Sequence, residues 1–221
     1  ISTMEMSISD RVISIYDKST IRIKSLDSVE GEYNKIIEYL DSKGKKARLG
    51  IKQNAILSYY DSFGNRYIKP IVVFGLEDRS SIVEQFNLSL DSFSLDSNTV
   101  LMGDKLASNL NFPSNLSEIT IISPLDANFL IPYKNFTYID QNFSFDKVNA
   151  IDDFSAKYVF IDYAEGQSLF QSASPYLGLD GLLTKAEVEY LENTFDNIEY
   201  SEWSDIYPLF FDAINMEKTL Y

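Results

Sequence analysis

The 221-residue sequence contains no cysteine and no histidine. The lack of cysteine excludes disulfides, thiolate zinc sites and cysteine nucleophiles, and the lack of histidine excludes Ser-His catalysis and histidine-ligated metals. These absences leave no candidate catalytic residue of those kinds, and we expect no metal and no cofactor. The missing cysteine does not identify a compartment, because an oxidising environment permits disulfides without requiring them.

Long apolar runs are missing as well. No 18 consecutive residues are apolar, so we expect no segment of the sequence to cross a bilayer. The first residues lack the basic region and apolar core of a signal peptide. The hydrophobic content of 45% is nevertheless enough to bury one sizeable core or two modest ones.

Basic residues are scarce relative to acidic ones. The sequence has 19 lysines and arginines against 33 acidic residues. Residues 80–221 hold 6 of these basic residues and 22 of the acidic ones. Such a surface repels nucleic acids and anionic lipids. A hydrolase that uses paired carboxylates is an alternative, but a solvated acidic surface explains them better. The pairs are Asp152-Asp153 and Glu77-Asp78, and a cluster comprises Glu187, Glu189 and Glu192.

The first part of the sequence predicts a strand, a helix and a hairpin. Ile21 and Ile23 alternate with basic residues over 20–25, which is typical of a strand with one buried face. Apolar residues then recur at helical spacing over 32–43, and Gly44 follows as a stop signal. Two strands, at 48–60 and 66–76, flank a turn at 61–65. Pro70 places the start of the second strand at an edge or a bulge.

A similar pattern returns near the other end. Residues 176–180 predict a strand, Thr184 to Glu187 a capping box that opens a helix, and residues 198–203 another strand. Two strand-helix-strand units from opposite ends can share one sheet with helices on one side. The middle of the chain would then be an insertion, with a helix start at 81–84 and strands at 118–122, 136–145 and 156–162.

The last helix is predicted to start at about residue 207 with Pro208 in its first turn, the alternative being a kink at Pro208. No Gly or Asn cap follows before the sequence ends. This region, with Trp203, Leu209-Phe210 and Met216-Glu217-Lys218, resembles the return segment of the LolC/LolE family of ABC transporter membrane subunits. Residues 100–110 are similar to the family's strand-to-helix segment. Residues 11–15, before the strand at 21–23, are similar to its exit from the first membrane helix. The resemblance runs in order over nearly the whole sequence.

The resemblance implies an α+β fold in two parts. A porter-like βαβ/βαβ domain with ferredoxin-like layers would comprise residues 1–77 and 174–221. A β-rich, sabre-like domain, residues 78–173, would be inserted into it. Membrane helices would lie outside both ends, in the inner membrane of a Gram-negative bacterium, and this domain would face the periplasm.

The resemblance also implies a function. Transporters of this family release lipoproteins from the inner membrane and pass them to a LolA-type periplasmic chaperone. A second permease subunit completes the membrane part, and a separate cytoplasmic subunit hydrolyses ATP. The domain would be a non-catalytic mechanical relay and binding surface. MacB-like efflux proteins and FtsX-like regulators of the cell wall share the architecture, so these roles are the alternative.

An apolar loop is the candidate site for a partner. Two prolines enclose several apolar side chains between predicted strands, whereas surface loops are usually polar. In the LolC branch the corresponding position carries a hook that engages the chaperone. The alternative is that these side chains pack into the core, and the choice between the LolC and LolE branches is left open. The candidate residues are Pro124, Leu125, Phe129, Leu130, Ile131, Pro132 and Tyr133.

Overall fold

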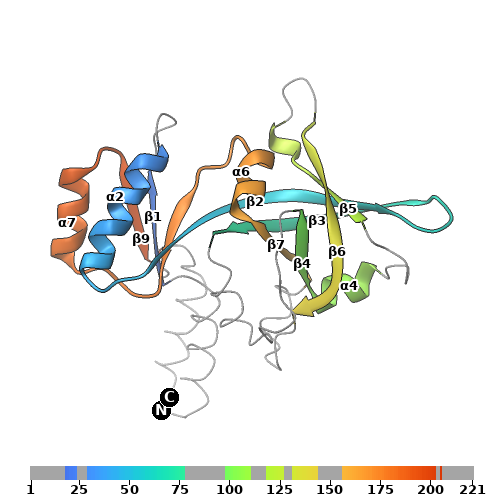
Figure 1. Ribbon diagram of the computed structural model, residues 1–221, viewed down its shortest axis with the longest axis horizontal. Helices are drawn as coiled ribbons and strands as arrows, with labels where there is room; N and C mark the ends of the chain where they lie inside the picture. The colour runs from blue at the N-terminus through green and yellow to red at the C-terminus, as the bar shows by residue number, and fades with distance from the viewer. Residues whose placement is uncertain are drawn as a thin grey trace, which may run out of the picture. The chain divides into compact units, whose positions relative to one another are not determined.

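The computed structural model describes residues 18–23, 29–77, 98–110, 118–126, 131–143, 156–202 and 205. The described elements form a mixed α+β structure with a large mixed sheet and four α-helices (Figure 1). The expected α+β class is thus confirmed. The strands are β1 (Ser19–Ile23), β2 (Ala47–Tyr60), β3 (Arg66–Leu76), β4 (Thr99–Gly103), β5 (Glu118–Ile122), β6 (Tyr133–Phe143), β7 (Tyr158–Asp162), β8 (Tyr176–Leu179) and β9 (Ile198–Glu202). The helices are α2 (Val29–Ser42), α4 (Asp104–Leu110), α6 (Tyr163–Leu169) and α7 (Lys185–Thr194), with a 3₁₀ turn η2 (Pro124–Asp126).

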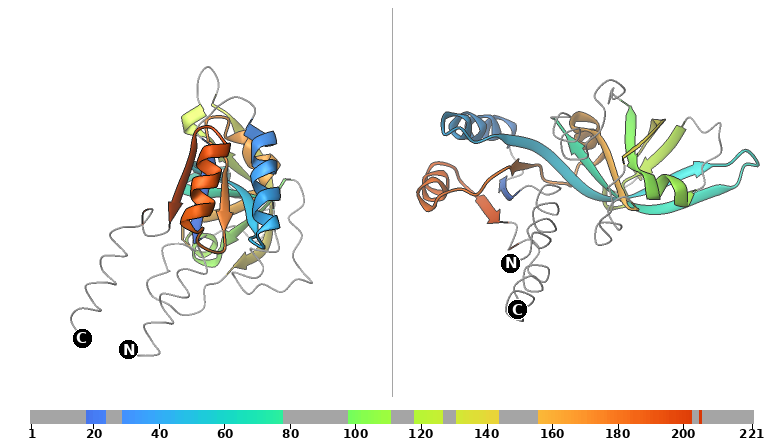
Figure 2. Two further views of the ribbon diagram at one scale, coloured as in Figure 1. Left: turned by 90° about the vertical axis from the view of Figure 1, so that its left-hand side faces the viewer. Right: turned by 90° about the horizontal axis from the view of Figure 1, so that it is seen from below.

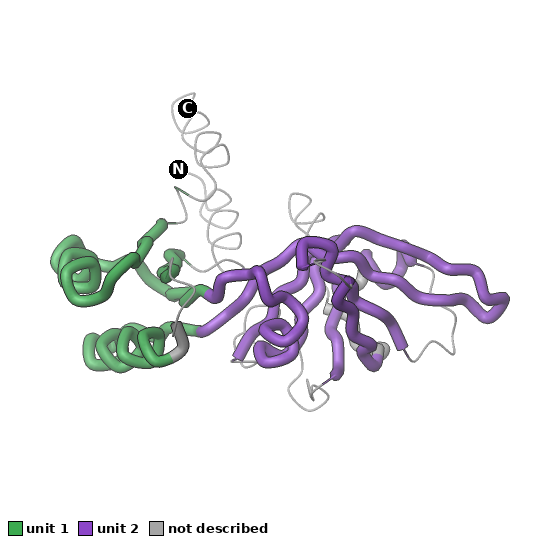
Figure 3. The backbone as a smooth tube through the Cα atoms, turned by 90° about the horizontal axis from the view of Figure 1, so that it is seen from above, with its two compact units in different colours: residues 1–48, 176–221 green, residues 49–175 purple. Residues whose placement is uncertain are grey.

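The chain divides into two compact units (Figure 3). Unit 1 comprises residues 1–48 and 176–221, and unit 2 comprises residues 49–175. The expected division after residue 77 differs from this one, because most of β2 and all of β3 lie in unit 2. These strands pair there with β5 and β7, so they belong to the core of the middle segment.

Unit 1 contains two strand-helix-strand segments, one from each end of the chain. Its strands run in the order β8-β1-β9, with β2 next to β8, and β1 is antiparallel to both of its neighbours. Helices α2 and α7 lie on the same side of these strands (Figure 2). The side chains buried there are Ile21, Ile23, Tyr33, Ile36, Leu40, Leu177, Leu179 and Leu191.

The ends of both helices follow the sequence signals. Gly44 has a φ of 69°, and the amides of Lys45 and Gly44 donate to the carbonyls of Leu40 and Asp41, at 3.0 and 2.9 Å. This is a Schellman cap, which requires the left-handed conformation that glycine adopts without strain. At the start of α7 the predicted capping box of Thr184 and Glu187 is present. The strands and helices that the sequence predicted at both ends of the chain are thus confirmed in unit 1.

Unit 2 is built around a closed ring of six strands. The order β3-β7-β4-β6-β5-β2 is completed by the β2–β3 pairing, so the ring is a small barrel. The β3–β7 and β4–β6 pairs are parallel and the other four are antiparallel. Alternate side chains point into the barrel, among them Ala55, Leu57, Ile71, Val73, Ile119, Ile121 and Phe136.

The β2–β3 hairpin extends beyond the ring (Figure 1). Strand β2 pairs with β5 only at Ile56–Ser58, and β3 pairs with β7 only from Val72 onward. Pro70 therefore lies where β3 has a free edge, as its missing N–H predicts.

Helix α6 packs closely against β3 in unit 2. A Cβ atom added to Gly75 would lie 3.3 Å from the Cα atom of Gly166, and a Cβ added to either glycine would lie 2.7 Å from Cγ2 of Ile51. The two backbones approach each other because neither residue has a side chain. This contact fixes α6 and the connection that follows it.

Several expectations fall outside the described residues. These are the helix start at 81–84, the segment 11–15, and the last helix with Trp203 and Pro208. Among the described helices, none is long and apolar enough to cross a membrane.

Candidate partner-binding loop

The predicted apolar loop connects β5 to β6 in unit 2. Ile122 pairs with Tyr133, and the amide of Ser123 donates to the carbonyl of Pro132 at 2.9 Å, so the loop is closed at its base. The turn η2 occupies its first part. Residues 127–130 are outside the described residues, and two of the candidates, Phe129 and Leu130, are among them.

The other apolar candidates are exposed. Leu125, Ile131 and Tyr133 have exposed fractions of 63%, 58% and 69%. Pro124 is exposed and Pro132 is half-buried. Packing into the core, the alternative considered from the sequence, therefore does not apply to the first three. Exposed apolar side chains that lie together on one loop are typical of a binding surface.

Two hydrogen bonds to Asp126 hold the first part of the loop. The hydroxyl of Ser123, which is fully buried, donates to Oδ2 of Asp126. Oδ1 of Asp126 accepts from the amide of Ser172 at 2.6 Å. Ser172 follows α6 in the chain, so this contact joins the loop to a segment 46 residues away.

These bonds also change the acidity of the carboxyl group. Burial by itself raises the pKa of Asp126, but the hydrogen bonds from Ser123 and Ser172 outweigh burial and lower the pKa below its usual value. The carboxylate is therefore the form that this site stabilises.

A second contact ties the other side of the loop to α6. The ammonium of Lys134, at the start of β6, forms an ion pair with Glu165. The same ammonium lies 6.0 Å from the ring centroid of Phe136. With both sides of the loop anchored, its exposed side chains are held before any partner binds, and this lowers the entropic cost of binding.

Asp126→Asn is expected to weaken the anchoring of the loop. The variant loses the charged acceptor, so the free energy of unfolding should fall by about 1 kcal/mol at neutral pH. Because the pKa of Asp126 is lowered in the folded state, its stabilisation is present above the unfolded-state pKa of about 3.9 and is lost as the pH falls through the lower folded value. The difference between Asp126→Asn and the parent should therefore shrink under acidic conditions.

Urea unfolding of both proteins at neutral and acidic pH measures this difference. Asp196→Asn, a change at an exposed carboxyl group in unit 1, is the control. A difference that stays constant or grows in acid would contradict the assigned role of Asp126.

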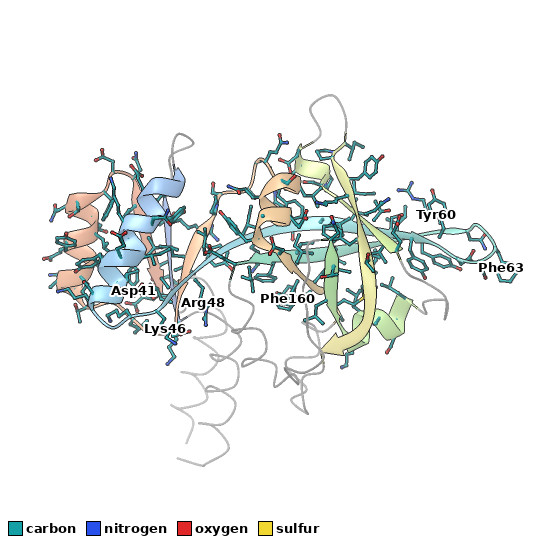
Figure 4. All side chains as sticks on the ribbon, in the orientation of Figure 1. Asp41, Lys46, Arg48, Tyr60, Phe63 and Phe160 are labelled. Carbon is teal, nitrogen blue, oxygen red and sulfur yellow. The ribbon has the colours of Figure 1, made fainter. Side chains whose placement is uncertain are left out.

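The sequence analysis did not single out the tip of the β2–β3 hairpin. Phe63 is 89% exposed at its end, and Tyr60 is also exposed (Figure 4). Oδ1 of Asp61 accepts from the amides of Phe63 and Asn65, at 2.9 and 2.8 Å, which fixes the turn. The turn itself was predicted, but the aromatic residues around it were a signal that could have indicated an exposed apolar tip.

Three of the described carboxyl groups have a lowered pKa. No group of three or more acidic residues among the described ones could hold a metal ion. Hydrogen bonds lower the pKa of Asp61, Asp126 and Glu187, whereas a general acid needs a raised pKa. Glu187 caps α7 and pairs with Lys45 at 3.4 Å, so its role is structural. Asp78, Asp152 and Asp153 lie outside the described residues.

Comparisons with known proteins do not assign the chain to a family. No protein-family model matches the chain, and a search of curated proteins finds no match.

Proposed function

We propose that this chain is the periplasmic domain of a LolC/LolE-type permease subunit, in a transporter that releases lipoproteins from the inner membrane and passes them to a periplasmic chaperone. The family motifs at residues 11–15, 100–110 and 203–218 support the proposal. The organisation of the two units is compatible with it. The proposed role is non-catalytic, and ATP hydrolysis takes place in a separate cytoplasmic subunit.

The finer fold assignment belongs to this proposal. Unit 1 would be the porter-like domain, because its β1-α2-β2 and β8-α7-β9 segments interleave in the strand order β2-β8-β1-β9. That order is compatible with a ferredoxin-like arrangement. Unit 2 would be the sabre-like insertion, because its core is a β-barrel contributed by the middle of the chain. The relay of motion would pass through the segments at both ends of the chain.

The loop between β5 and β6 carries the proposal of chaperone binding. It presents Leu125, Ile131 and Tyr133 to solvent, and the contacts of Asp126 and Lys134 hold it from two sides. Preorganisation lowers the entropic cost of binding, and tyrosine is enriched among the side chains that dominate binding energy. The partner would be a LolA-type chaperone, whose lipid-binding function suits an apolar contact.

The test is a calorimetric titration of the chain with the LolA-type chaperone of the same organism. The variant Leu125→Ser/Ile131→Ser/Tyr133→Ser is expected to weaken binding at least tenfold, which corresponds to about 1.4 kcal/mol or more. The matched control, Leu182→Ser/Tyr190→Ser, removes two exposed apolar side chains from unit 1 and should bind like the parent.

Three results would count against parts of the proposal. Binding that the loop variant retains would move the chaperone site elsewhere. Equal losses in both variants would indicate a nonspecific apolar effect. No binding by the parent protein would overturn the chaperone role and favour the LolE-like branch or the MacB-like or FtsX-like alternative.

A further inference from the structure

The tip of the β2–β3 hairpin gathers exposed apolar side chains. Among the described residues nine large apolar side chains are exposed, and four of these lie within residues 60–68. They are Tyr60, Phe63, Tyr67 and Ile68, of which Phe63 is the most exposed. We name residues 59–68 the hairpin tip, and Figure 4 shows Phe63 at its very end. Such a group is more than the scattered apolar residues of an ordinary surface.

The rings surround the hairpin tip and do not form one flat face. In the hairpin register Tyr67 lies opposite Tyr59, and Arg66 lies opposite Tyr60. Since neighbouring positions of a strand point to opposite faces, Tyr60 and Tyr67 lie on opposite sides of the hairpin. Phe63 lies in the turn between them. A flat partner can contact one of these sides only, whereas a fluid medium into which the tip inserts contacts all of them.

The turn satisfies several of its own backbone groups. The amides of Asp61 and Gly64 donate to the carbonyls of Asn65 and Asp61, each at 3.0 Å. The amides of Phe63 and Asn65 donate to Oδ1 of Asp61. A segment that enters the apolar side of a bilayer must bond its backbone groups internally, because little water is present there. These four amides are bonded before insertion, and the fixed shape of the turn lowers the entropic cost of binding.

The acidic group of the hairpin tip is bonded internally as well. Oδ2 of Asp61 accepts from the side-chain amide of Asn65 at 2.9 Å and from the hydroxyl of Tyr67 at 3.3 Å. Such bonds reduce the cost of taking a carboxylate out of water but do not remove its charge. The turn therefore tolerates shallow burial rather than deep burial.

The hairpin differs in charge from the rest of the chain. Residues 50–76 contain one acidic residue, Asp61, and three basic ones, Lys52, Arg66 and Lys69, in a chain of net charge −14. Arg66 is exposed, and its Nε donates to Ser58 at 2.9 Å. A guanidinium has five donors, so this bond leaves others for a phosphate. Aromatic residues next to a cation are typical of segments at a membrane interface.

The base of the hairpin tip is held firmly within unit 2. Tyr59 is buried, and its hydroxyl donates to the carbonyl of Leu110 at the end of α4. The ring of Tyr59 stacks on that of Tyr67, with centroids 5.0 Å apart. In the antiparallel β2–β5 pair, the direction toward the tip is the direction away from the partner-binding loop. The hairpin tip is therefore a separate surface.

We propose that the hairpin tip inserts into the interface of a phospholipid bilayer with zwitterionic headgroups. Phe63 reaches the boundary of the acyl chains, Tyr60 and Tyr67 lie among the headgroups, and Arg66 bonds a lipid phosphate. Tyrosine is enriched at this level because its ring is apolar and its hydroxyl is polar. The charge of Asp61 keeps the insertion shallow. Zwitterionic headgroups are favoured because the acidic remainder of the chain repels anionic lipids. The proposal goes beyond the transport role and does not rest on it.

Sedimentation of the chain with sucrose-loaded vesicles of phosphatidylcholine tests the proposal. Binding should be weaker than that of a myristoyl chain, whose association constant is about 10⁴ M⁻¹, because the tip has less apolar area. Lipid concentrations up to about 10 mM are therefore needed. We expect the bound fraction to rise with lipid concentration at both low and high sodium chloride, since the contact is mainly apolar.

Three variants identify the part of the chain that binds. Phe63→Ser should lower the partition coefficient by about fivefold or more, because it removes the deepest apolar side chain. Leu182→Ser, which removes an exposed apolar side chain from unit 1, should leave the coefficient unchanged. Phe63→Trp should bind at least as well as the parent. The difference between the emission spectra of Phe63→Trp and the parent should shift to shorter wavelengths when vesicles are added.

Circular dichroism and the urea midpoint establish that Phe63→Ser is folded, as the exposure of Phe63 leads us to expect. Three results would overturn the proposal: no sedimentation of the parent at the highest lipid concentration, equal binding by Phe63→Ser, or binding only to vesicles that contain phosphatidylglycerol. The first result would favour a protein with an apolar pocket as the partner of the tip. Because Phe63 lies outside the loop, chaperone binding can fail or succeed independently of these results.

Discussion

Phe136→Ala should destabilise unit 2 by about 3–5 kcal/mol, whereas Tyr133→Ala should change the free energy of unfolding by less than about 0.5 kcal/mol. Both residues lie on β6, three positions apart, so their side chains point to opposite faces of the strand. Phe136 is fully buried, and its removal leaves a cavity in the barrel as well as losing apolar burial. Tyr133 is exposed, and its ring contributes little to the core.

Urea unfolding of the two variants measures this contrast directly. The result also tests the register of β6, because a slip of one residue would move every side chain to the other face. A large loss for Tyr133→Ala with a small one for Phe136→Ala would reverse the faces. It would then contradict the exposure of Tyr133 at the end of the loop.

Gly75→Ala is expected to destabilise unit 2 by about 1–3 kcal/mol through overpacking. The new Cβ atom would lie 2.7 Å from Cγ2 of Ile51, 3.3 Å from the Cα atom of Gly166 and 3.4 Å from the carbonyl oxygen of Asp162. Two of these three atoms belong to the backbone of α6 and the residue before it. The shortest contact is with the side chain of Ile51, which is buried and must shift, and the Cα atom of Gly166 must also give way by a few tenths of an ångström, so the packing of α6 against β3 is strained.

The functional consequence of Gly75→Ala follows from what α6 carries. A displaced helix moves Glu165 relative to Lys134 and the following Ser172 relative to Asp126. The variant should therefore bind the loop partner more weakly, although it changes no residue of the loop.

Urea unfolding and the chaperone titration are the measurements for Gly75→Ala. Gly31→Ala is the matched control, because Gly31 lies in α2 with open space around its Cα atom, and alanine is the better helix former. A second control uses Ile51→Ala, in whose background the cost of Gly75→Ala should be smaller by at least about 0.5 kcal/mol. Additive losses, or a neutral Gly75→Ala, would show that α6 does not approach β3 as closely as described.

The elements that the sequence predicted well depend on contacts between near neighbours. The capping box of Thr184 and Glu187 spans three residues, and the cap at Gly44 spans five. The β2–β3 hairpin follows from two apolar runs joined by a turn that Asp61 stabilises. Such signals involve residues only a few positions apart, so they can be recognised in the sequence alone.

The boundary between the units could not be predicted in the same way. Strand β2 runs without interruption from Ala47 to Tyr60, and the two units divide within it after Arg48. The apolar pattern has no break there, since one strand can continue through both units. What assigns residues 49–77 to unit 2 is their pairing with β5 and β7, whose positions in the chain are far away.

The candidate loop was likewise predicted only in part from the sequence. The sequence identified the apolar loop but left both exposure and burial open for its side chains. Of these side chains, Leu125, Ile131 and Tyr133 are exposed in the structure, and the pairing of Ile122 with Tyr133 sets the face on which Tyr133 lies. The anchoring contacts of Asp126 and Lys134 involve residues after position 160 and had no local signal.

By itself, then, the sequence determined the α+β class, the helix caps, the hairpin turn, the acidic surface and the lack of cysteine and histidine chemistry. Those properties depend on composition and on side chains a few positions apart. Tertiary structure alone decided that six strands close into a ring, that α6 can approach β3 through two glycines, and that the tip of the β2–β3 hairpin extends beyond that ring. These features depend on strand registers between distant segments, which the local pattern of apolar and polar residues does not encode.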